Sequence, residues 1–267
     1  MSFSPGSVID ALPLGGRLRR ITLQVEDPAT LAIPAGGDCA VGVYFDPESP
    51  DQGRTYSIRH HRGDQIDLDI VLHTGGRGSD WAQWVNVGDR VGLDHARSWY
   101  RRPPGTVGQL LLTDLAGLPA TARILEETPP TVATTVLVEA VDHQDLDYLP
   151  TRAGVTVVPS IGTGNGVAPG RLAELVREVD LPLYGYCWFA GEAATSRAVR
   201  KHLRSRGWTI DQYDITGYWR LDSDAWDAQF AAVSDEVARV YEQAIAAGKG
   251  NKAALEEFDD ALEQIGL

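Results

Sequence analysis

The stretch RRPPGTVGQLLLTD (residues 101–114) separates two halves of the chain that have different hydrophobic patterns. Before it, apolar and polar residues alternate, as in QIDLDIVL (65–72). After it come short, continuous apolar runs, of which GQLLLTD (108–114) is the first. Alternation is typical of half-buried antiparallel strands, whereas continuous runs are typical of strands that are buried on both faces. The sequence therefore predicts two domains of different class that meet near residue 103.

Residues 1–103 are predicted to form a small antiparallel β-barrel. Alternating or apolar runs, separated by glycine and proline, predict strands at 17–27, 38–46, 54–60, 65–73 and 89–96. Five or six short strands at this spacing are typical of a barrel. One helical turn fits residues 79–85, and Ser79 is its predicted N-cap.

Residues 104–221 are predicted to form a doubly wound α/β domain. Strands are predicted at 108–114, 131–140, 154–160, 184–192 and 211–219, and helices at 115–127, 168–179 and 193–207. Strands that alternate with helices in this way form a parallel sheet that is covered by helices.

Residues 222–267 have helical periodicity throughout, with a break near 248–250, and are predicted to form a C-terminal helical extension. This extension either covers the cleft between the domains or pairs two chains. The apolar side chains that would pair two chains are Trp226, Phe230, Val233, Val237 and Val240.

Composition excludes several classes of function. The net charge of −13 argues against a nucleic-acid or anionic-membrane partner, because the overall field repels polyphosphates. No apolar run approaches the ~20 residues that span a bilayer. The first residues lack the basic flank and apolar block of a signal peptide, so a cytoplasmic protein is expected. The cysteines and histidines have no spacing typical of a metal site, and none is predicted.

The run RTYSIR (54–59) carries the first candidate site. On a strand, Arg54 and Tyr56 share one face, and Ser57 lies on the other. An arginine can bind a pyrophosphate through two nitrogens, and a tyrosine ring can lie against a flat aromatic ligand. From its residues alone, this run is either an ordinary strand with a polar face or a cradle for a flat ligand with an anionic end.

The run HTGGRGSDWAQW (73–84) carries the second candidate site. Glycines at 75, 76 and 78 can expose backbone amides, and the helix that begins at Ser79 directs its amino end to the same place. Glycine-rich amides and a helix N-terminus together form an anion site. The alternative is a turn that is followed by a helix cap.

These two runs and three further blocks resemble the siderophore-interacting protein family of the ferredoxin-reductase superfamily. RTYSIR is similar to the flavin-binding signature of that family. VLHTGGRGSDWA (71–82), VGDRVGL (87–93), FAGEAATSRAVRKHLRSRG (189–207) and GYWR (217–220) resemble its later blocks in the same order. The resemblance covers about residues 50–220 and implies bound FAD, a pyridine-nucleotide-like domain and reduction of iron held by a siderophore.

The resemblance also implies which residues hold the cofactor. Tyr56 would face the flavin ring, and Arg54 and the glycine-rich loop would hold the pyrophosphate. The full set of implied FAD-binding residues is Arg54, Tyr56, Ser57, Arg59, His73, Gly76, Gly78, Ser79 and Trp81.

The implied nicotinamide-binding residues are Asp114, Gly191 and Glu192, at the carboxyl ends of two predicted strands. Glu192 is equally well placed to cap the helix that follows it. The family usually has G-D-E-T-A-L-P-A where this chain has TDLAGLPA (113–120). The electron donor is therefore expected to be NADH, NADPH, a reduced ferredoxin or a free flavin.

Ferric catecholate complexes are anionic, so the substrate is expected to need a local positive patch. Arg97, Arg101 and Arg102 surround two aromatic residues at the junction of the domains, where the flavin edge would open. Arg220 and Lys249 are further candidates. The alternative is a solvated linker.

The resemblance thus predicts an FAD-dependent ferric-siderophore reductase without a catalytic base or nucleophile, because the flavin supplies the chemistry. One rival is a related flavin or quinone reductase. The other is a siderophore-binding protein without catalytic activity.

Overall fold

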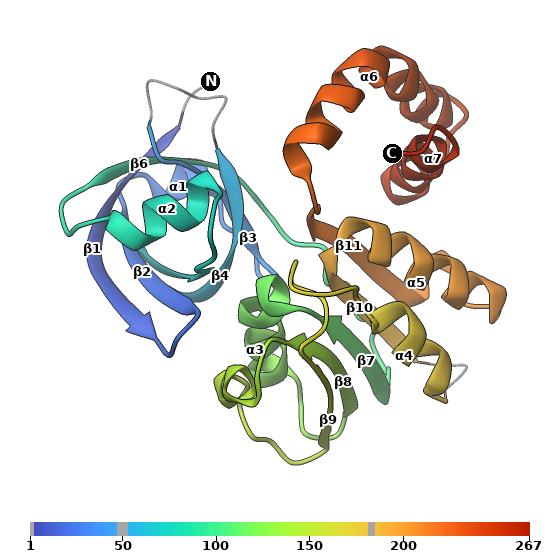
Figure 1. Cartoon of the computed structure of the whole chain (residues 1–267), viewed down its shortest axis with the longest axis horizontal. Helices are drawn as coiled ribbons and strands as arrows, with labels where there is room; N and C mark the ends of the chain where they lie inside the picture. Colours follow the sequence, from blue (N-terminus) through green and yellow to red (C-terminus); the bar gives the residue numbers. More distant parts are fainter. Residues whose placement is uncertain (1–2, 47–52, 181–184) are drawn as a thin grey trace.

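The computed structural model describes residues 3–46, 53–180 and 185–267. In it the chain forms a β-barrel, a parallel sheet flanked by helices, and a pair of C-terminal helices (Figure 1). Within this described part of the chain, no helix has both the length and the apolar character needed to cross a membrane. The predicted fold class is confirmed.

The barrel is closed and antiparallel, with strand order β1-β2-β5-β4-β3-β6. Its strands are β1 (Ser4–Leu14), β2 (Leu18–Val25), β3 (Ala40–Tyr44), β4 (Arg54–Arg62), β5 (Gln65–Val71) and β6 (Arg90–Arg97). The alternation in β5 puts Ile66, Leu68 and Ile70 in the barrel core, where each is at most 2% exposed. Two short helices, α1 (Pro28–Leu31) and α2 (Arg77–Trp84), pack on the same core.

Strand β1 is absent from the predicted strands. Pro5 and Pro13 lack the N–H that a strand donates to its neighbour, and the second half of the segment is largely exposed, so no alternation reveals it. In the structure Gly6 pairs with Val25 of β2 on one side and with Val91 of β6 on the other. Pairing between segments far apart in the chain therefore forms this strand and closes the barrel.

The second domain is a five-stranded parallel sheet with strand order β11-β10-β7-β8-β9. Its strands are β7 (Gly108–Thr113), β8 (Ala133–Ala140), β9 (Val155–Ile161), β10 (Tyr186–Glu192) and β11 (Tyr213–Trp219). Helix α3 (Leu118–Glu127) covers one face, and α4 (Leu172–Glu178) and α5 (Ala193–Ser205) cover the other. The order reverses between β7 and β10, and open α/β sheets bind ligands at the carboxyl ends of strands at such a point.

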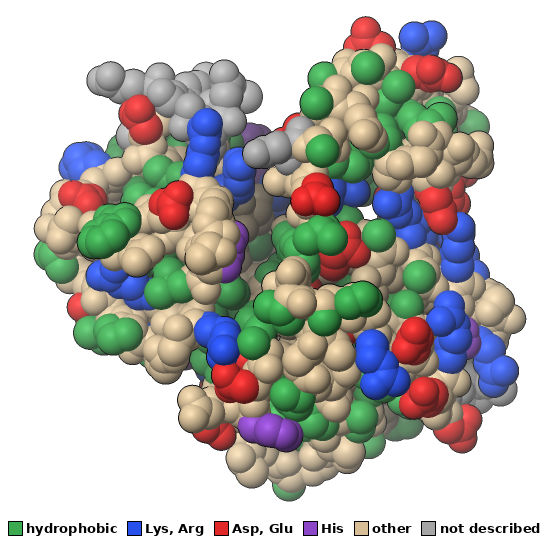
Figure 2. Space-filling view, viewed as in Figure 1, with side chains coloured by type: hydrophobic (Ala, Val, Ile, Leu, Met, Phe, Trp, Pro, Cys, Tyr) green, Lys and Arg blue, Asp and Glu red, His purple; other side chains and the backbone are tan. Residues whose placement is uncertain are grey.

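The C-terminal extension is a hairpin of α6 (Ser223–Ala246) and α7 (Asn251–Gln264). Four of the residues that would pair two chains pack within this hairpin: Trp226, Phe230, Val233 and Val237. They contact the core formed by Phe258 and Leu262 of α7, and the pairing of two chains through them stays a prediction. Figure 2 shows a notch between the C-terminal hairpin and the barrel, and the hairpin forms one side of this notch.

The hairpin is fixed to α5 by ion pairs. Arg200, whose side chain is 5% exposed, lies 2.7 Å from Asp259 and 2.9 Å from Asp260. Lys201 pairs with Glu263 at 2.7 Å. Helix α7 is therefore attached to the outer helical layer of the second domain.

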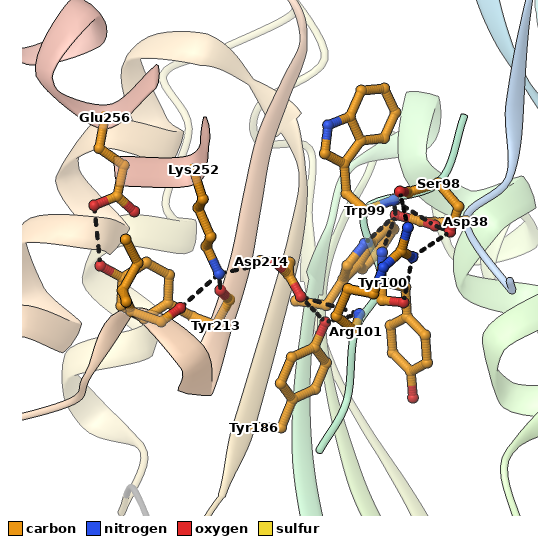
Figure 3. A network of polar contacts seen from close by, with 12 residues as sticks. Asp38, Ser98, Trp99, Tyr100, Arg101, Tyr186, Tyr213, Asp214, Lys252 and Glu256 are labelled. Carbon is orange, nitrogen blue, oxygen red and sulfur yellow. Dashed lines mark hydrogen bonds and ion pairs between the residues drawn. The ribbon is translucent and has the colours of Figure 1, made fainter. Parts of the chain in front are cut away.

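The linker between the domains is held by a buried carboxylate, Asp38, of the barrel (Figure 3). Asp38 accepts hydrogen bonds from the Ser98 hydroxyl (2.5 Å) and the backbone amides of Trp99 (3.1 Å) and Tyr100 (2.8 Å). It also accepts one from the indole Nε1 of Trp188 in β10 at 3.1 Å. One side chain thus connects the barrel, the linker and the sheet.

A second buried carboxylate, Asp214, continues this network at the start of β11 (Figure 3). It accepts hydrogen bonds from the Arg101 backbone amide (3.0 Å) and the Tyr186 hydroxyl (2.6 Å). Lys252 of α7 pairs with it at 2.8 Å. The linker, the sheet and the C-terminal hairpin are therefore joined through hydrogen-bonded groups.

Candidate functional site

The RTYS run of β4 lies at the surface of the barrel beside the amino end of α2. Arg54 is exposed and Tyr56 is half-buried. Burial raises the pKa of the Tyr56 hydroxyl, and the nearby charge of Arg54 opposes that shift, as expected for side chains on one face of a strand. The Tyr56 ring lies 6.3 Å from Phe45, which stacks on Trp81 of α2 at 4.7 Å.

Gly78 explains how closely α2 approaches Tyr56. A Cβ at position 78 would lie 1.8 Å from the Tyr56 hydroxyl oxygen, so no larger residue fits without displacing the ring. The glycine predicted to expose an amide therefore also allows the first turn of the helix to rest on the tyrosine.

The loop before α2 is built from two glycines in conformations that other residues rarely adopt. Gly75 has φ +75° and Gly76 has φ +108°. The His73 ring lies over Gly76, because a Cβ there would be 2.8 Å from the ring carbon Cε1. Gly76 precedes the helix, and no side chain caps it. The amino end of α2 thus has the backbone and dipole of an anion site.

Ser79 is not the N-cap that the sequence predicts. It lies inside the first turn of α2, where its hydroxyl donates to the His73 carbonyl and accepts from the His73 amide, both at 2.8 Å. The helix begins two residues earlier than predicted, because the glycines allow the chain to turn sharply before Arg77. Ser79 therefore fixes the start of the glycine-rich loop.

Two buried hydroxyls beside this strand have no hydrogen-bond partner within the described residues. One is Ser57 Oγ, next to Tyr56, and the other is the Tyr218 hydroxyl of β11. An unsatisfied buried polar group costs about 1–3 kcal/mol. A ligand with polar atoms along one edge would remove this cost, so the residues present fit a flavin.

Arg59, a predicted cofactor-binding residue, forms a contact between the two domains in the structure. Its guanidinium donates to both carboxylate oxygens of Glu126 in α3, at 2.7 and 2.6 Å. Its side chain is 8% exposed. Arg123 of α3 donates to the Ile58 carbonyl at 2.9 Å. Arg59 thus connects the barrel to the second domain, and its predicted part in cofactor binding stays a prediction.

The predicted nicotinamide residues lie where the strand order reverses, at the carboxyl ends of β7 and β10. Asp114 is fully buried, and burial raises its pKa to about 6. Its carboxylate accepts from the Trp219 indole at 2.6 Å and from the Ala116 amide at 2.9 Å. A Cβ on Gly191 would lie 2.9 Å from Asp114 Oδ2, so the glycine permits this packing.

Glu192 caps α5, as the alternative interpretation of its position predicts. Its carboxylate accepts from the Thr195 amide at 2.8 Å and from the Thr195 hydroxyl at 3.2 Å. The carboxylates of Asp114 and Glu192 therefore both accept hydrogen bonds from nearby backbone amides.

The structure separates the five predicted substrate cations into two groups. Arg97 remains at the RTYS strand, where it donates to the Thr55 hydroxyl at 2.7 Å and lies over the Trp99 ring at 5.0 Å. Arg220 follows β11 at the carboxyl edge of the sheet and lies 3.9 Å from the center of the Trp226 ring. Burial lowers the pKa of Arg220.

Arg101 stays near Arg97: its backbone amide donates to Asp214, but its guanidinium reaches back to the Ser98 carbonyl at 2.8 Å and the Ser98 hydroxyl at 3.1 Å. The other two cations lie toward the opposite end of the sheet, because the linker runs along the sheet before it enters β7. Arg102 donates to the Thr106 carbonyl at 3.2 Å. Lys249 pairs with Glu257 in the hairpin, three residues before Lys252, which also contacts Asp214. A seven-residue strand spans roughly 20 Å. Arg102 and Lys249 therefore lie apart from Arg97 and Arg220, and the part of all five cations in substrate binding stays a prediction.

The predicted site omits Tyr218, Trp219 and Asp38. The first two belong to GYWR, one of the blocks that carry the resemblance, so the motif contained a signal for them. Asp38 gives no such signal, because its partners Ser98 and Trp188 lie 60 and 150 residues away in the chain.

Both domains match models of one protein family. Residues 7–97 match the siderophore-interacting FAD-binding domain, and residues 107–222 match the siderophore-interacting protein model. These matches cover most of the chain. The chain belongs to the siderophore-interacting protein family.

Curated relatives and a solved structure agree with this assignment. The chain is 24% identical to the NADPH-dependent ferric-chelate reductase of Escherichia coli K12 over 177 residues, which are 65% of this chain and 66% of that protein, just under two thirds. It is 25% identical to the ferric vibriobactin reductase ViuB of Vibrio cholerae over 199 residues, 71% of this chain and 73% of that one. The siderophore-interacting protein of Acinetobacter baumannii shares the fold, with a TM-score of 0.75 at 19% identity over 90% of this chain and all of that chain.

Proposed function

We propose that this protein is an FAD-dependent reductase that converts the Fe(III) of a ferric siderophore to Fe(II). The observation that carries the proposal is the RTYS strand beside the glycine-rich amino end of α2, in a chain whose two domains both match the siderophore-interacting family. The E. coli and V. cholerae relatives, which are named as ferric-chelate and ferric vibriobactin reductases, support the reaction.

Four of the predicted residues form the core of the proposed FAD site. Arg54 and the backbone at Gly76 and Gly78 would hold the pyrophosphate, because an arginine fork and helix-terminal amides suit its charge. Tyr56 would hold the ring. When bound, FAD supplies the redox chemistry, taking two electrons from a donor and giving them singly to Fe(III).

The proposed donor is NADPH or NADH, bound where the strand order reverses. Because Asp114 and Glu192 are engaged with the local backbone and Trp219, the donor would be held by backbone groups and by the space that Gly191 leaves. A reduced ferredoxin is the second candidate donor. A cytoplasmic location, where these donors are found, is part of the proposal.

The proposed substrate is a ferric siderophore that approaches the flavin at the junction of the domains. Arg97 and Arg220 are the predicted cations that remain near the carboxyl edge of the sheet. Their role would be to attract the chelate and orient it. The step at the iron needs no proton from the protein, since only electrons move to Fe(III).

A steady-state assay tests this function. FAD-loaded protein is mixed with NADPH or NADH and a ferric siderophore, and Fe(II) is trapped by a ferrous-specific chelator. We expect Fe(II) release that depends on both the FAD and the reduced nucleotide. Reduction of quinones without any release of Fe(II) would favour the rival flavin reductase. A colourless protein that still binds the chelate would favour the non-catalytic binding protein.

A further inference from the structure

Arg220 is a half-buried cation at the carboxyl edge of the sheet. It follows Trp219, the last residue of β11, which lies beside Glu192 of β10. Within the described residues Arg220 forms no ion pair and donates no hydrogen bond. The contact that it does form is with Trp226 of α6, where the guanidinium carbon lies 3.9 Å from the center of the indole ring.

The charge of Arg220 is held without an acidic partner. Burial lowers its pKa, and the charge of Arg197 acts in the same direction. Three carboxylates oppose this shift from beyond ion-pair distance: Asp259, Glu192 and Asp227. Charges that are withdrawn from water in proteins are usually paired with an opposite charge. The position of Arg220 therefore suits a negative group that the chain itself does not supply.

The aromatic contact stabilises the cation in a way that an ion pair would not. A guanidinium over the face of a tryptophan is attracted by the negative charge density of the ring. The ring touches the flat face of the guanidinium, whereas the N–H donors of an arginine lie in its plane. A carboxylate partner would occupy those donors. Trp226 thus stabilises the charge of Arg220 and leaves its N–H groups free for a ligand.

The C-terminal hairpin keeps the Trp226 ring in place. Asp222 has φ +53° and accepts from the Trp226 amide at 3.1 Å, so α6 begins in a sharp turn beside the end of β11 (Figure 1). The indole stacks on Phe230, one turn further along α6, with ring centers 4.8 Å apart and planes 10° apart. Phe230 in turn meets Phe258 of α7 edge-on at 6.4 Å. The ring that covers Arg220 is therefore fixed by both helices.

We propose that Trp226 is a positioning residue for the substrate. It holds the Arg220 guanidinium so that the free N–H edge binds an oxyanion of the ferric chelate. This inference rests on the proposed function and deepens it, since it gives the C-terminal hairpin a part in recognising an anionic chelate. The chelate would enter by the notch between the hairpin and the barrel (Figure 2).

The substitution Trp226→Leu tests the proposal, because it removes the aromatic face and keeps an apolar side chain. Fe(II) release is measured at saturating NADPH with two substrates, an anionic ferric tris-catecholate siderophore and the uncharged ferric tris-acetohydroxamate complex. We expect KM for the anionic chelate to rise about fivefold, with kcat and both other KM values unchanged. Trp226→Phe, which keeps a ring of weaker attraction, should raise the same KM only about twofold.

Phe258→Leu is the matched control. Phe258 belongs to the same hairpin core, but its ring meets Phe230 and not Arg220. Its loss should lower the melting temperature about as much as Trp226→Leu does and leave KM for the anionic chelate unchanged. A merely structural role of Trp226 would make the two variants alike.

Arg220→Gln shows whether Trp226 acts through the arginine. Alone it should raise KM for the anionic chelate about tenfold. Adding Trp226→Leu to it should raise KM no further, because a positioning residue has no effect once the group that it positions is gone.

Four outcomes would overturn the proposal while the proposed function stands. The first is an unchanged KM for the anionic chelate in both Trp226 variants, and the second is an equal rise in Phe258→Leu. The third is an equal rise for the uncharged chelate. The fourth is a rise in KM for NADPH instead, which would assign Arg220 to a phosphate of the donor. An unaltered protein that releases no Fe(II) from either chelate would contradict the proposed function itself.

Discussion

Two polar clusters lie where the barrel meets the sheet, and they differ in how completely their groups are paired. In the first, Asp38 receives hydrogen bonds from a hydroxyl, two backbone amides and an indole. In the second, the hydroxyls of Ser57 and Tyr218 have no partner within the described residues. The first cluster has the properties of a permanent joint, and the second has those of a site that a ligand completes.

The contrast follows from the chemistry of the groups. A carboxylate can accept several hydrogen bonds at once, so one buried aspartate can satisfy the amides of a bent linker. A hydroxyl has one donor hydrogen and fewer acceptor sites than a carboxylate, so it satisfies fewer neighbours.

The largest expected effect on stability comes from removing the Asp38 carboxylate. Asp38→Ala should lower the free energy of unfolding by about 3 kcal/mol or more, because it leaves buried donors unpaired. Chemical denaturation measures this loss. Asp10→Ala is the control, since Asp10 is exposed and, within the described residues, accepts a hydrogen bond only from the neighbouring Ala11 amide. Equal losses for the two variants would show that Asp38 does not join the domains.

The carboxyl edge of the sheet should respond to pH through Asp114. Burial raises its pKa to about 6 in the folded protein, so the folded state holds the proton more tightly than the unfolded state. The stability that this proton contributes is complete below pH about 4 and is lost as the pH rises through about 6. Relative to Asp114→Asn, the free energy of unfolding should therefore fall by up to about 3 kcal/mol between pH 4 and 7.

The measurement is a series of urea titrations of both proteins across this pH range. Asp38 and Asp114 can be compared directly, because both carboxylates are buried and both accept a hydrogen bond from an indole. A relative stability that rises with pH would mean that the bonds from Trp219 and Ala116 outweigh the cost of burial.

A smaller effect is expected at the glycine-rich amino end of α2 from Gly78→Ala. The new methyl group would lie 1.8 Å from the Tyr56 hydroxyl oxygen and must displace the ring or the helix. We expect FAD affinity to fall about tenfold, or about 1.4 kcal/mol. Gly16→Ala is the control, because a methyl group at that position would have no atom within 4 Å outside its chain neighbours. Unchanged FAD affinity in Gly78→Ala would contradict the proposal that Tyr56 holds the flavin ring.

Local pattern predicted much of this molecule. The alternation in β5 and the apolar runs of β7 and β10 depend on neighbours in the chain, and the structure has strands there. The closeness of Arg54 and Tyr56 follows from the two-residue period of a strand. Such features can be predicted from the sequence because their cause lies within a few residues along the chain.

The features that were not predictable depend on contacts between distant segments. Strand β1 exists because it pairs with both β2 and β6. The linker follows the sheet because the Arg101 amide donates to Tyr186 and Asp214, which lie 85 and 113 residues further along the chain. Arg59 binds Glu126 only because α3 docks on the barrel. No pattern of neighbouring residues in the sequence predicts these arrangements.

One anaerobic experiment tests the central claim most directly. FAD-loaded protein is reduced with a single equivalent of dithionite and mixed with excess ferric siderophore and a ferrous-specific chelator, while the flavin spectrum is followed. The account predicts that the oxidised flavin bands return as two Fe(II) ions are trapped per flavin, since each flavin carries two electrons and each iron takes one. A flavin that stays reduced, with no Fe(II) trapped, would contradict the account.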